Sequence, residues 1–180
     1  MSAPGMPADI AVDLSVDLCG IRLRNPVLAA SGTFGFGREM AEVFPLSSLG
    51  GIVSKGITLL PRRGNPPPRV AETASGMLNS VGLQNPGIEA FLREELPFMV
   101  AQGCAVAVNI AGAGAEEYEA LVERLDRTPV DLIEVNLSCP NVREGCMAFG
   151  ATARGVESLV SRIRPRTRKP LAIKLTPQAD

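Results

Sequence analysis

Five short apolar segments, separated by stretches typical of helices, constrain the fold of this chain more than any other feature. Alternating strands and helices build a parallel sheet covered by helices, the α/β class. A β-hairpin is expected before them, over residues 14–24. The predicted strands cover residues 26–30, 51–56, 105–110, 132–137 and 170–175. The predicted helices cover residues 38–44, 88–103 with an interruption at Pro97, 116–126 and 151–164.

Polar side chains fall at or near the carboxyl end of every predicted strand. They are Ser31, Lys55, Asn109, Asn136 with Cys139, and Lys174. A (β/α)8 barrel surrounds one ligand with its strand ends, whereas a doubly wound sheet binds at a single switch point. Five strands do not close an eight-stranded barrel, which typically needs about 250 residues. We therefore expect residues 1–180 to be the N-terminal part of one barrel domain, with the C-terminal remainder missing.

The segment 134–141, Glu-Val-Asn-Leu-Ser-Cys-Pro-Asn, is predicted to be a buried strand that stops in a polar loop. Pro140 cannot continue a strand ladder, so the chain turns there. We interpret Cys139 as a catalytic base, and Asn136 and Asn141 as hydrogen-bonding partners of a planar polar ligand. The alternative is a structural cysteine near a turn that contains two asparagines, and this segment alone does not decide between them.

The absence of histidine narrows the possible chemistry. It excludes histidine-based triads and HExxH zinc sites, so a general base must be Cys, Lys, Asp, Glu or Tyr. The four cysteines form no CxxC pair, which argues against a zinc or iron–sulfur site, and no metal site is predicted. A formal charge of −1 argues against a nucleic-acid partner. Without a signal-peptide pattern or an apolar run of roughly 20 residues, we expect a cytoplasmic protein without a membrane segment.

A long polar stretch over residues 59–86 interrupts the alternation. Excursions of this length in a compact domain are usually lids or binding loops. Its last part and the residues after it, 79–87, are rich in carboxamides and turn formers, although Asn-Pro-Gly is also an ordinary turn that leads into a helix. The glycines of residues 31–37 would let backbone N–H groups approach a ligand closely.

Several long motifs, in the same order along the chain, resemble those of the dihydroorotate dehydrogenases from about Leu14 onward. They are residues 54–58 (Ser-Lys-Gly-Ile-Thr), 63–69, 76–87 and 136–141 (Asn-Leu-Ser-Cys-Pro-Asn). The resemblance implies an FMN-binding (β/α)8 TIM barrel that oxidises (S)-dihydroorotate to orotate in de novo pyrimidine (UMP) biosynthesis. Cys139 stands where the membrane-bound members have serine, so the resemblance is to the soluble class 1 enzymes.

Within class 1, residues 55–58 (Lys-Gly-Ile-Thr), 82–87 (Gly-Leu-Gln-Asn-Pro-Gly) and 144–150 look most like class 1B, and the fumarate-linked class 1A is the less favoured choice. The resemblance to class 1B implies that electrons pass to NAD+ through a partner subunit that carries FAD and a [2Fe–2S] cluster. It also implies a homodimer within a heterotetramer.

The resemblance also implies roles for individual residues. Cys139 would remove the C5 proton of dihydroorotate while a hydride passes from C6 to flavin N5. Lys174, or else Lys55, would stabilise the reduced flavin. Cys146 replaces the glycine more common in relatives and is expected to be a spectator, the alternative being that it oxidises or forms a disulfide with Cys139. Substrate-binding residues would be Lys55, Asn79, Ser80, Val81, Gly82, Leu83, Asn136 and Asn141. FMN-binding residues would be Ser31, Lys55, Gly56, Asn109, Asn136 and Lys174.

Two other interpretations remain open at the level of sequence. A tRNA dihydrouridine synthase is also a flavin barrel with a Cys-Pro after a strand, but the charge of −1 and the motif at residues 79–87 disfavour it. Alternatively, if the 180 residues are the whole product, the chain would be an inactive fragment or an interaction module that pairs through its open sheet edges.

Overall fold

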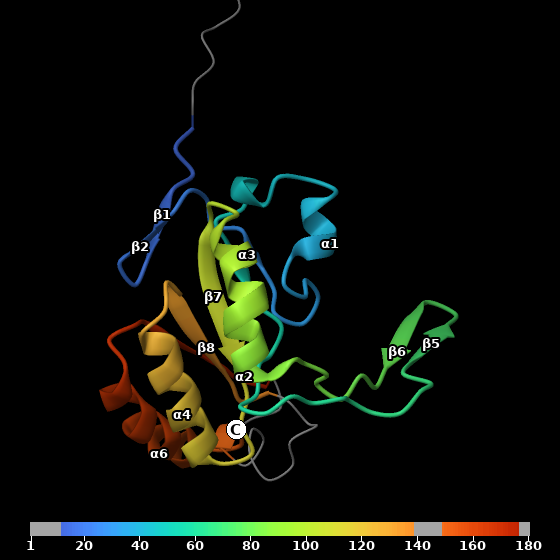
Figure 1. Ribbon diagram of the computed structural model, residues 1–180, viewed down its shortest axis with the longest axis vertical. Coiled ribbons are helices and arrows are strands. Elements are labelled where there is room, and N and C mark those ends of the chain that lie inside the picture. The colour runs from blue at the N-terminus through green and yellow to red at the C-terminus, as the bar shows by residue number, and fades with distance from the viewer. Residues whose placement is uncertain (1–11, 139–148, 177–180) are drawn as a thin grey trace, which may run out of the picture.

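A five-stranded parallel sheet forms the centre of the computed structural model, which describes residues 12–138 and 149–176 (Figure 1). The strands lie side by side in the order in which they occur along the chain. They are β3 (Leu28–Ala29), β4 (Gly51–Val53), β7 (Ala105–Ile110), β8 (Leu132–Asn136) and β9 (Leu171–Lys174). All five predicted strands are thereby confirmed. The predicted residues Cys139, Asn141 and Cys146 lie outside the described residues.

Helices follow the strands, as the alternation predicted. They are α1 (Arg38–Ala41), α2 (Gly87–Ala90), the π-helical segment η2 (Phe91–Glu95), α3 (Leu96–Val100), α4 (Ala115–Asp126) and α6 (Ala153–Ile163), with short 3₁₀ segments η1 (Leu46–Ser48) and η3 (Arg164–Arg166). Among the described residues, no helix has the length and apolar character needed to cross a membrane.

The two faces of the sheet bury different partners because side chains alternate along a strand. On β8, Ile133 and Val135 join the main core, which also contains side chains from α2, α3, α4 and α6. Leu132 points to the opposite face and packs with Val53 and Ala107. Helices on one face and strands in chain order are the features of a barrel wall, whereas a doubly wound sheet has helices on both faces. The described sheet is therefore an open part of a barrel.

The predicted N-terminal hairpin is present as β1 (Val16–Leu18) and β2 (Ile21–Leu23). Its two-residue turn, Cys19–Gly20, has positive φ at both positions, as a type I′ hairpin turn requires. Leu18 and Ile21 pack against the inner apolar face of the sheet, so the hairpin covers part of the surface that faces away from the helices.

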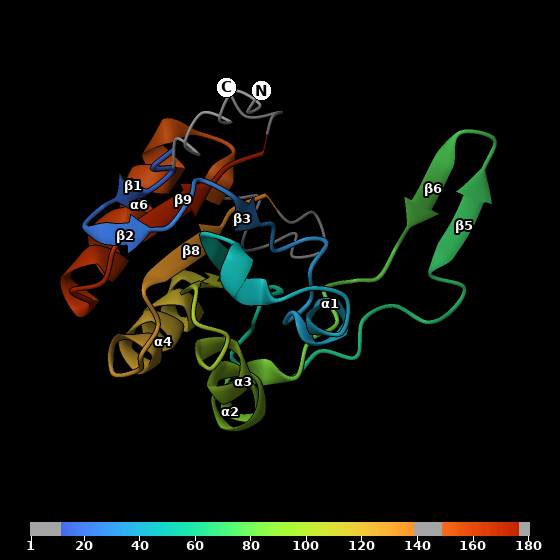
Figure 2. The same cartoon turned by 90° about the horizontal axis from the view of Figure 1, so that it is seen from above.

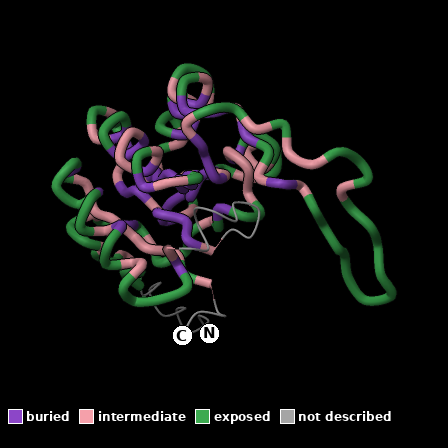
Figure 3. The backbone as a smooth tube through the Cα atoms, turned by 90° about the horizontal axis from the view of Figure 1, so that it is seen from below, coloured by how far each residue is buried: buried purple, intermediate pink, exposed green. Residues whose placement is uncertain are grey.

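An extended arm projects from the body between β4 and α2, and Figure 2 shows it from above. The arm ends in an antiparallel hairpin of β5 (Val70–Thr73) and β6 (Gly76–Asn79), and every residue of both strands is exposed (Figure 3). Sequence analysis predicted the excursion but not this hairpin. An exposed hairpin lacks the alternation of apolar and polar residues that a half-buried strand displays.

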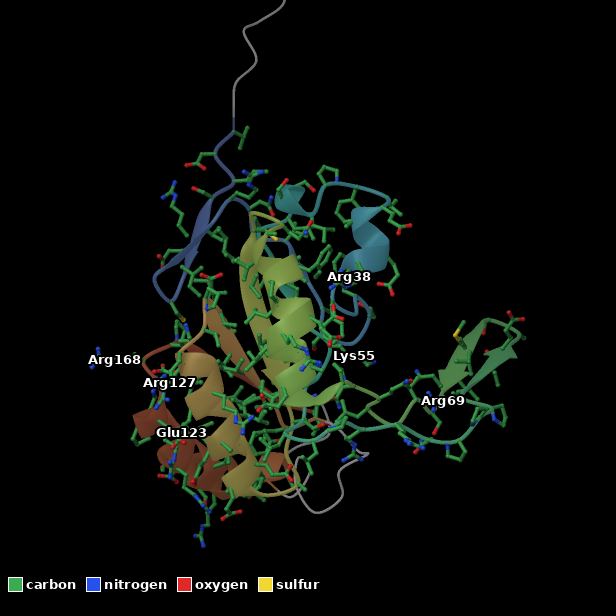
Figure 4. The ribbon with its side chains drawn as sticks, in the orientation of Figure 1. Arg38, Lys55, Arg69, Glu123, Arg127 and Arg168 are labelled. Atoms are coloured by element: carbon green, nitrogen blue, oxygen red, sulfur yellow. The ribbon has the colours of Figure 1, made fainter. Side chains whose placement is uncertain are left out.

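A guanidinium links the two segments of the arm below its hairpin. Arg69 donates through Nε to the backbone oxygen of Asn65 (2.5 Å), through Nη2 to that of Arg63 (2.9 Å), and through Nη1 to Oε1 of Gln84 (2.6 Å). Arg63 and Asn65 precede the hairpin and Gln84 follows it, so Arg69 joins the outgoing and returning segments (Figure 4).

The helix predicted over residues 88–103 is irregular at a different place from the one expected. The prediction placed an interruption at Pro97, but the chain stays helical there and instead widens into the π-helical segment just before it. Pro97 has no amide hydrogen, and the wider turn just before it, in which the amide of Leu96 bonds to the backbone oxygen of Phe91, accommodates its ring within the helix.

Ion pairs join helix α4 to α6 and to the η3 segment that follows it. Arg162 contacts Glu116 (2.8 Å) and Glu119 (2.5 Å), and Arg166 contacts Glu119 (2.7 Å) and Glu123. Exposed pairs contribute little individually, so the register of the two helices depends mainly on their shared apolar core.

We predict that Tyr118→Phe lowers the free energy of unfolding by about 1–2 kcal/mol, because a buried carbonyl loses its hydrogen-bond donor. Tyr118 is fully buried on α4, and its hydroxyl donates to the backbone oxygen of Asn136 at 2.8 Å. Urea unfolding of the protein as its gene encodes it measures the change. Ser158→Ala, which removes an exposed hydroxyl from α6, is the control. A loss no larger than that of the control would contradict the prediction.

Candidate functional site

The register of the parallel strands brings polar side chains together at the carboxyl end of the sheet. Asn109 of β7 lies opposite Glu134 of β8, and Asn136 of β8 lies opposite Lys174 of β9. Glu134 and Asn136 alternate with Ile133 and Val135 along β8, so they point away from the helices. The four side chains therefore share the inner face of the sheet.

Ser31, which follows β3, contacts side chains from β7, β8 and β9. Its Oγ donates to Oε1 of Glu134 (2.9 Å) and accepts from Nζ of Lys174 (3.1 Å). Nδ2 of Asn109 donates to the same Glu134 oxygen (2.5 Å) and lies 3.4 Å from the Ser31 hydroxyl. Side chains from β7, β8, β9 and the segment after β3 are thus joined in one hydrogen-bonded cluster, which we call the strand-end network.

Asn136 extends the network toward the loop that follows β8. Its Nδ2 donates to Oδ1 of Asn109 (3.3 Å), and its Oδ1 accepts from the amide and the hydroxyl of Ser138 (3.0 and 2.8 Å). From the helical side, Tyr118 binds the backbone oxygen of the same residue. Asn136 is therefore held on both sides of the sheet at the point where the strand ends.

The network is largely removed from solvent. Asn109 has no exposed surface, and Ser31 and Asn136 are each 7% exposed. Burying a carboxamide or a hydroxyl costs free energy unless a hydrogen bond replaces its contacts with water. Asn109 lies within an apolar strand, and its bonds to Glu134 and Asn136 replace the contacts with water that it loses there.

Gly56 and Lys55 border the network on the β4 side. A Cβ atom at Gly56 would lie 2.8 Å from Oδ1 of Asn109 and 2.9 Å from Cδ1 of Leu83, so a larger residue does not fit without movement. Lys55 is half-buried and lines an open cleft of about 510 Å³ together with Arg62 and Arg63. Figure 4 shows Lys55 on the side of the body from which the arm departs.

The predicted residues of the arm are only partly brought to this site. Leu83 reaches Gly56, and Gly82 is buried against Asn65. Asn79 ends β6 and is exposed, as is Ser80, whose hydroxyl accepts from Nδ2 of Asn65 (2.9 Å). Val81 likewise pairs through its backbone oxygen with the amide of Asn65 (3.1 Å). Asn79, Ser80 and Val81 thus belong to the arm and not to the strand-end network.

Glu134 is a member of the site that was not predicted from the sequence. The signal was present, because Glu134 shares the period-two face of Asn136 within an otherwise apolar strand, where a charged residue needs a specific partner. Within the described parts of the chain, no group of three or more His, Cys, Asp or Glu side chains is arranged to hold a metal ion.

Asn136 and Lys174 each keep hydrogen-bond donors beyond those used inside the network. Asn136 uses one of its two amide hydrogens on Asn109, and Lys174 uses one of its three ammonium hydrogens on Ser31. The oxygen of Asn136 is already bonded to Ser138. Such a surface suits a flat ligand that presents acceptors along one edge.

Known proteins with similar sequences carry the name dihydroorotate dehydrogenase. A family model described as dihydroorotate dehydrogenase matches residues 13–180. The "Dihydroorotate dehydrogenase B (NAD(+)), catalytic subunit" of Petrotoga mobilis is 49% identical over 169 residues, which cover 94% of this chain and 56% of the relative. The protein of the same name from Thermoanaerobacter pseudethanolicus is 52% identical over 166 residues, covering 92% of this chain and 55% of the relative. The chain thus spans about half the length of the curated relatives it matches.

A solved structure supports the fold. The dihydroorotate dehydrogenase of Eimeria tenella, crystallised with ferulenol, superposes with a TM-score of 0.65 at 22% identity, covering 86% of this chain and 43% of that one. The partial barrel described above is therefore shared with a member of the same family. Because the family model and both bacterial relatives match nearly the whole sequence, the chain belongs to the dihydroorotate dehydrogenase family.

Proposed function

We propose that the protein carrying this chain oxidises (S)-dihydroorotate to orotate with bound FMN, as part of pyrimidine (UMP) biosynthesis. The strand-end network is the observation that carries the proposal, because it gathers Ser31, Asn109, Asn136 and Lys174 at one edge of a barrel wall. Relatives about 50% identical are named as the catalytic subunit of dihydroorotate dehydrogenase B. Residues 1–180 would form the N-terminal part of a single barrel domain.

The described residues fit a flavin. The flavin ring has acceptors along its N1–C2 edge, and the donors of Lys174 and Asn136 suit such an edge. At Gly56, Asn109 and Leu83 occupy the space that a side chain would need, so only glycine fits beside the network without movement. Lys55 and Gly56, with Ser31, Asn109, Asn136 and Lys174, would hold the cofactor.

Each residue would then have a distinct task. FMN, when bound, supplies the acceptor for a hydride from C6 of the substrate. Cys139 takes the C5 proton on its thiolate, and because an ordinary thiol pKa lies near 8.5, this step needs the deprotonated form. Lys55, Asn136 and Asn141 would orient the pyrimidine and its carboxylate, and Asn79 and the backbone of residues 80–83 would join them from the arm.

A partner subunit would complete electron transfer. The relatives' name, catalytic subunit, supports a second kind of subunit, and their NAD(+) designation supports NAD+ as final acceptor. We propose that this partner carries FAD and a [2Fe–2S] cluster, and that two catalytic chains pair within a heterotetramer. We propose the cytoplasm as its location.

The proposal is tested by purifying the protein as its gene encodes it and adding dihydroorotate without oxygen. We expect stoichiometric FMN and bleaching of its visible absorption, because the substrate delivers two electrons to the flavin. Dihydrouridine in tRNA, offered as the control, should leave the oxidised spectrum unchanged. A protein that holds no flavin, or holds flavin that dihydroorotate does not reduce, would refute the proposal.

We predict that Cys139→Ala retains FMN but loses at least about a thousandfold in the rate of flavin reduction by dihydroorotate, because no base remains for the C5 proton. Stopped-flow absorbance measures the rate. Cys104→Ala, at a half-buried cysteine at the opposite end of the sheet, is the matched control. Turnover near the parent value in the Cys139 variant would exclude this thiol as the base.

We also predict that Cys139→Ser keeps weak activity that rises toward higher pH than in the parent. A hydroxyl gives up its proton far less readily than a thiol, so the fraction in the basic form grows only at higher pH. The rate of flavin reduction measured across pH 6–10 shows the shift. An unchanged pH–rate profile would contradict the assignment.

A further inference from the structure

The carboxylate of Glu134 lies at the centre of the strand-end network, although the proposed chemistry assigns it no step. Glu134 is half-buried on β8, and one of its oxygens accepts hydrogen bonds from Ser31 (2.9 Å) and Asn109 (2.5 Å). An ionised carboxylate can only accept hydrogen bonds. Every neighbour that contacts this oxygen must therefore turn a hydrogen toward it.

That requirement fixes the direction of each bond in the network. Ser31 has one hydroxyl hydrogen and gives it to Glu134, so its oxygen is left to accept from Lys174. Asn109 must turn its NH₂ group toward Glu134, which directs its oxygen to Asn136. Asn136 consequently presents an amide hydrogen to Asn109 and keeps its second amide hydrogen for a ligand.

The carboxylate of Glu134 also interacts electrostatically with the ammonium group of Lys174. Lys174 is linked to Glu134 through a single hydroxyl, with 3.1 Å from Nζ to the Ser31 oxygen and 2.9 Å from that oxygen to the carboxylate. Opposite charges this close in a partly buried site interact strongly, because little water separates them. The negative charge of Glu134 thus offsets part of the field that the Lys174 ammonium exerts at the carboxyl edge of the sheet.

We propose that Glu134 is a positioning residue with two effects on the bound flavin. It orients Asn109 and Asn136 so that the network presents donors to the ring, and its negative charge limits how strongly Lys174 favours the reduced, anionic ring. The inference rests on the proposed function, since it presumes that the ligand at this edge is a flavin.

The experiment compares Glu134→Gln with the parent and with Glu157→Gln, an exposed position on α6. Glutamine keeps the shape and one acceptor oxygen but removes the charge. At a fixed poised potential in a dye-equilibration titration, the ratio of reduced to oxidised bound FMN should rise about tenfold or more in the Glu134 variant. The Glu157 variant should match the parent.

The outcomes distinguish a failure of this inference from a failure of the proposed function. A parent-like potential in a folded, flavin-loaded Glu134→Gln protein overturns the inference while leaving the proposed function intact. A parent that purifies without flavin overturns both, and is recognised before any variant is made.

If the glutamine variant does not fold, Glu134→Asp is measured in its place, because aspartate keeps the charge but withdraws the oxygen by one methylene. Its potential should match the parent while FMN binds at least about tenfold more weakly, since the donors lose their anchor. Parent-like affinity for FMN would then overturn the inference.

Discussion

The register of β7, β8 and β9 is the constraint on which the rest of the structure depends. It sets Asn109 beside Glu134 and Asn136 beside Lys174, all on the face away from the helices. A slip of one residue would turn every side chain of a strand to the other face. It would drive the polar groups into the helical core and expose Ile133 and Val135. The apolar core and the polar site therefore favour the same strand register, because a shifted register would destabilise both.

Much of this could be predicted from sequence because it depends on local pattern. Apolar runs of four to six residues marked the five strands, and the polar residue after each run marked the edge where Ser31, Asn109, Asn136 and Lys174 meet. Parallel strands carry their carboxyl ends to the same edge, so this convergence follows from topology without knowledge of any distance.

The remainder depended on contacts between distant segments. Glu134 was not predicted as a site residue because its neighbours in sequence, Ile133 and Val135, are apolar. Its side chain nevertheless lies on the same face of β8 as that of Asn136. The hairpin of the arm has no buried face, so no periodicity marks it. The place of Asn79 and Ser80 depends on the course of the arm, which is set by Arg69 and Asn65 through contacts that no local pattern encodes.

The closure of the arm at its base has a consequence for how this region tolerates change in length. Because Arg62 and Asn85 pair through their backbones and Arg69 ties Asn65 to Gln84, the two segments of the arm stay together below the hairpin. The cost of enlarging a loop with fixed ends grows only slowly with the number of residues. The turn at residues 74–75, between the paired Thr73 and Gly76, is thus a position where a peptide tag or a fluorophore could be inserted without moving the sheet.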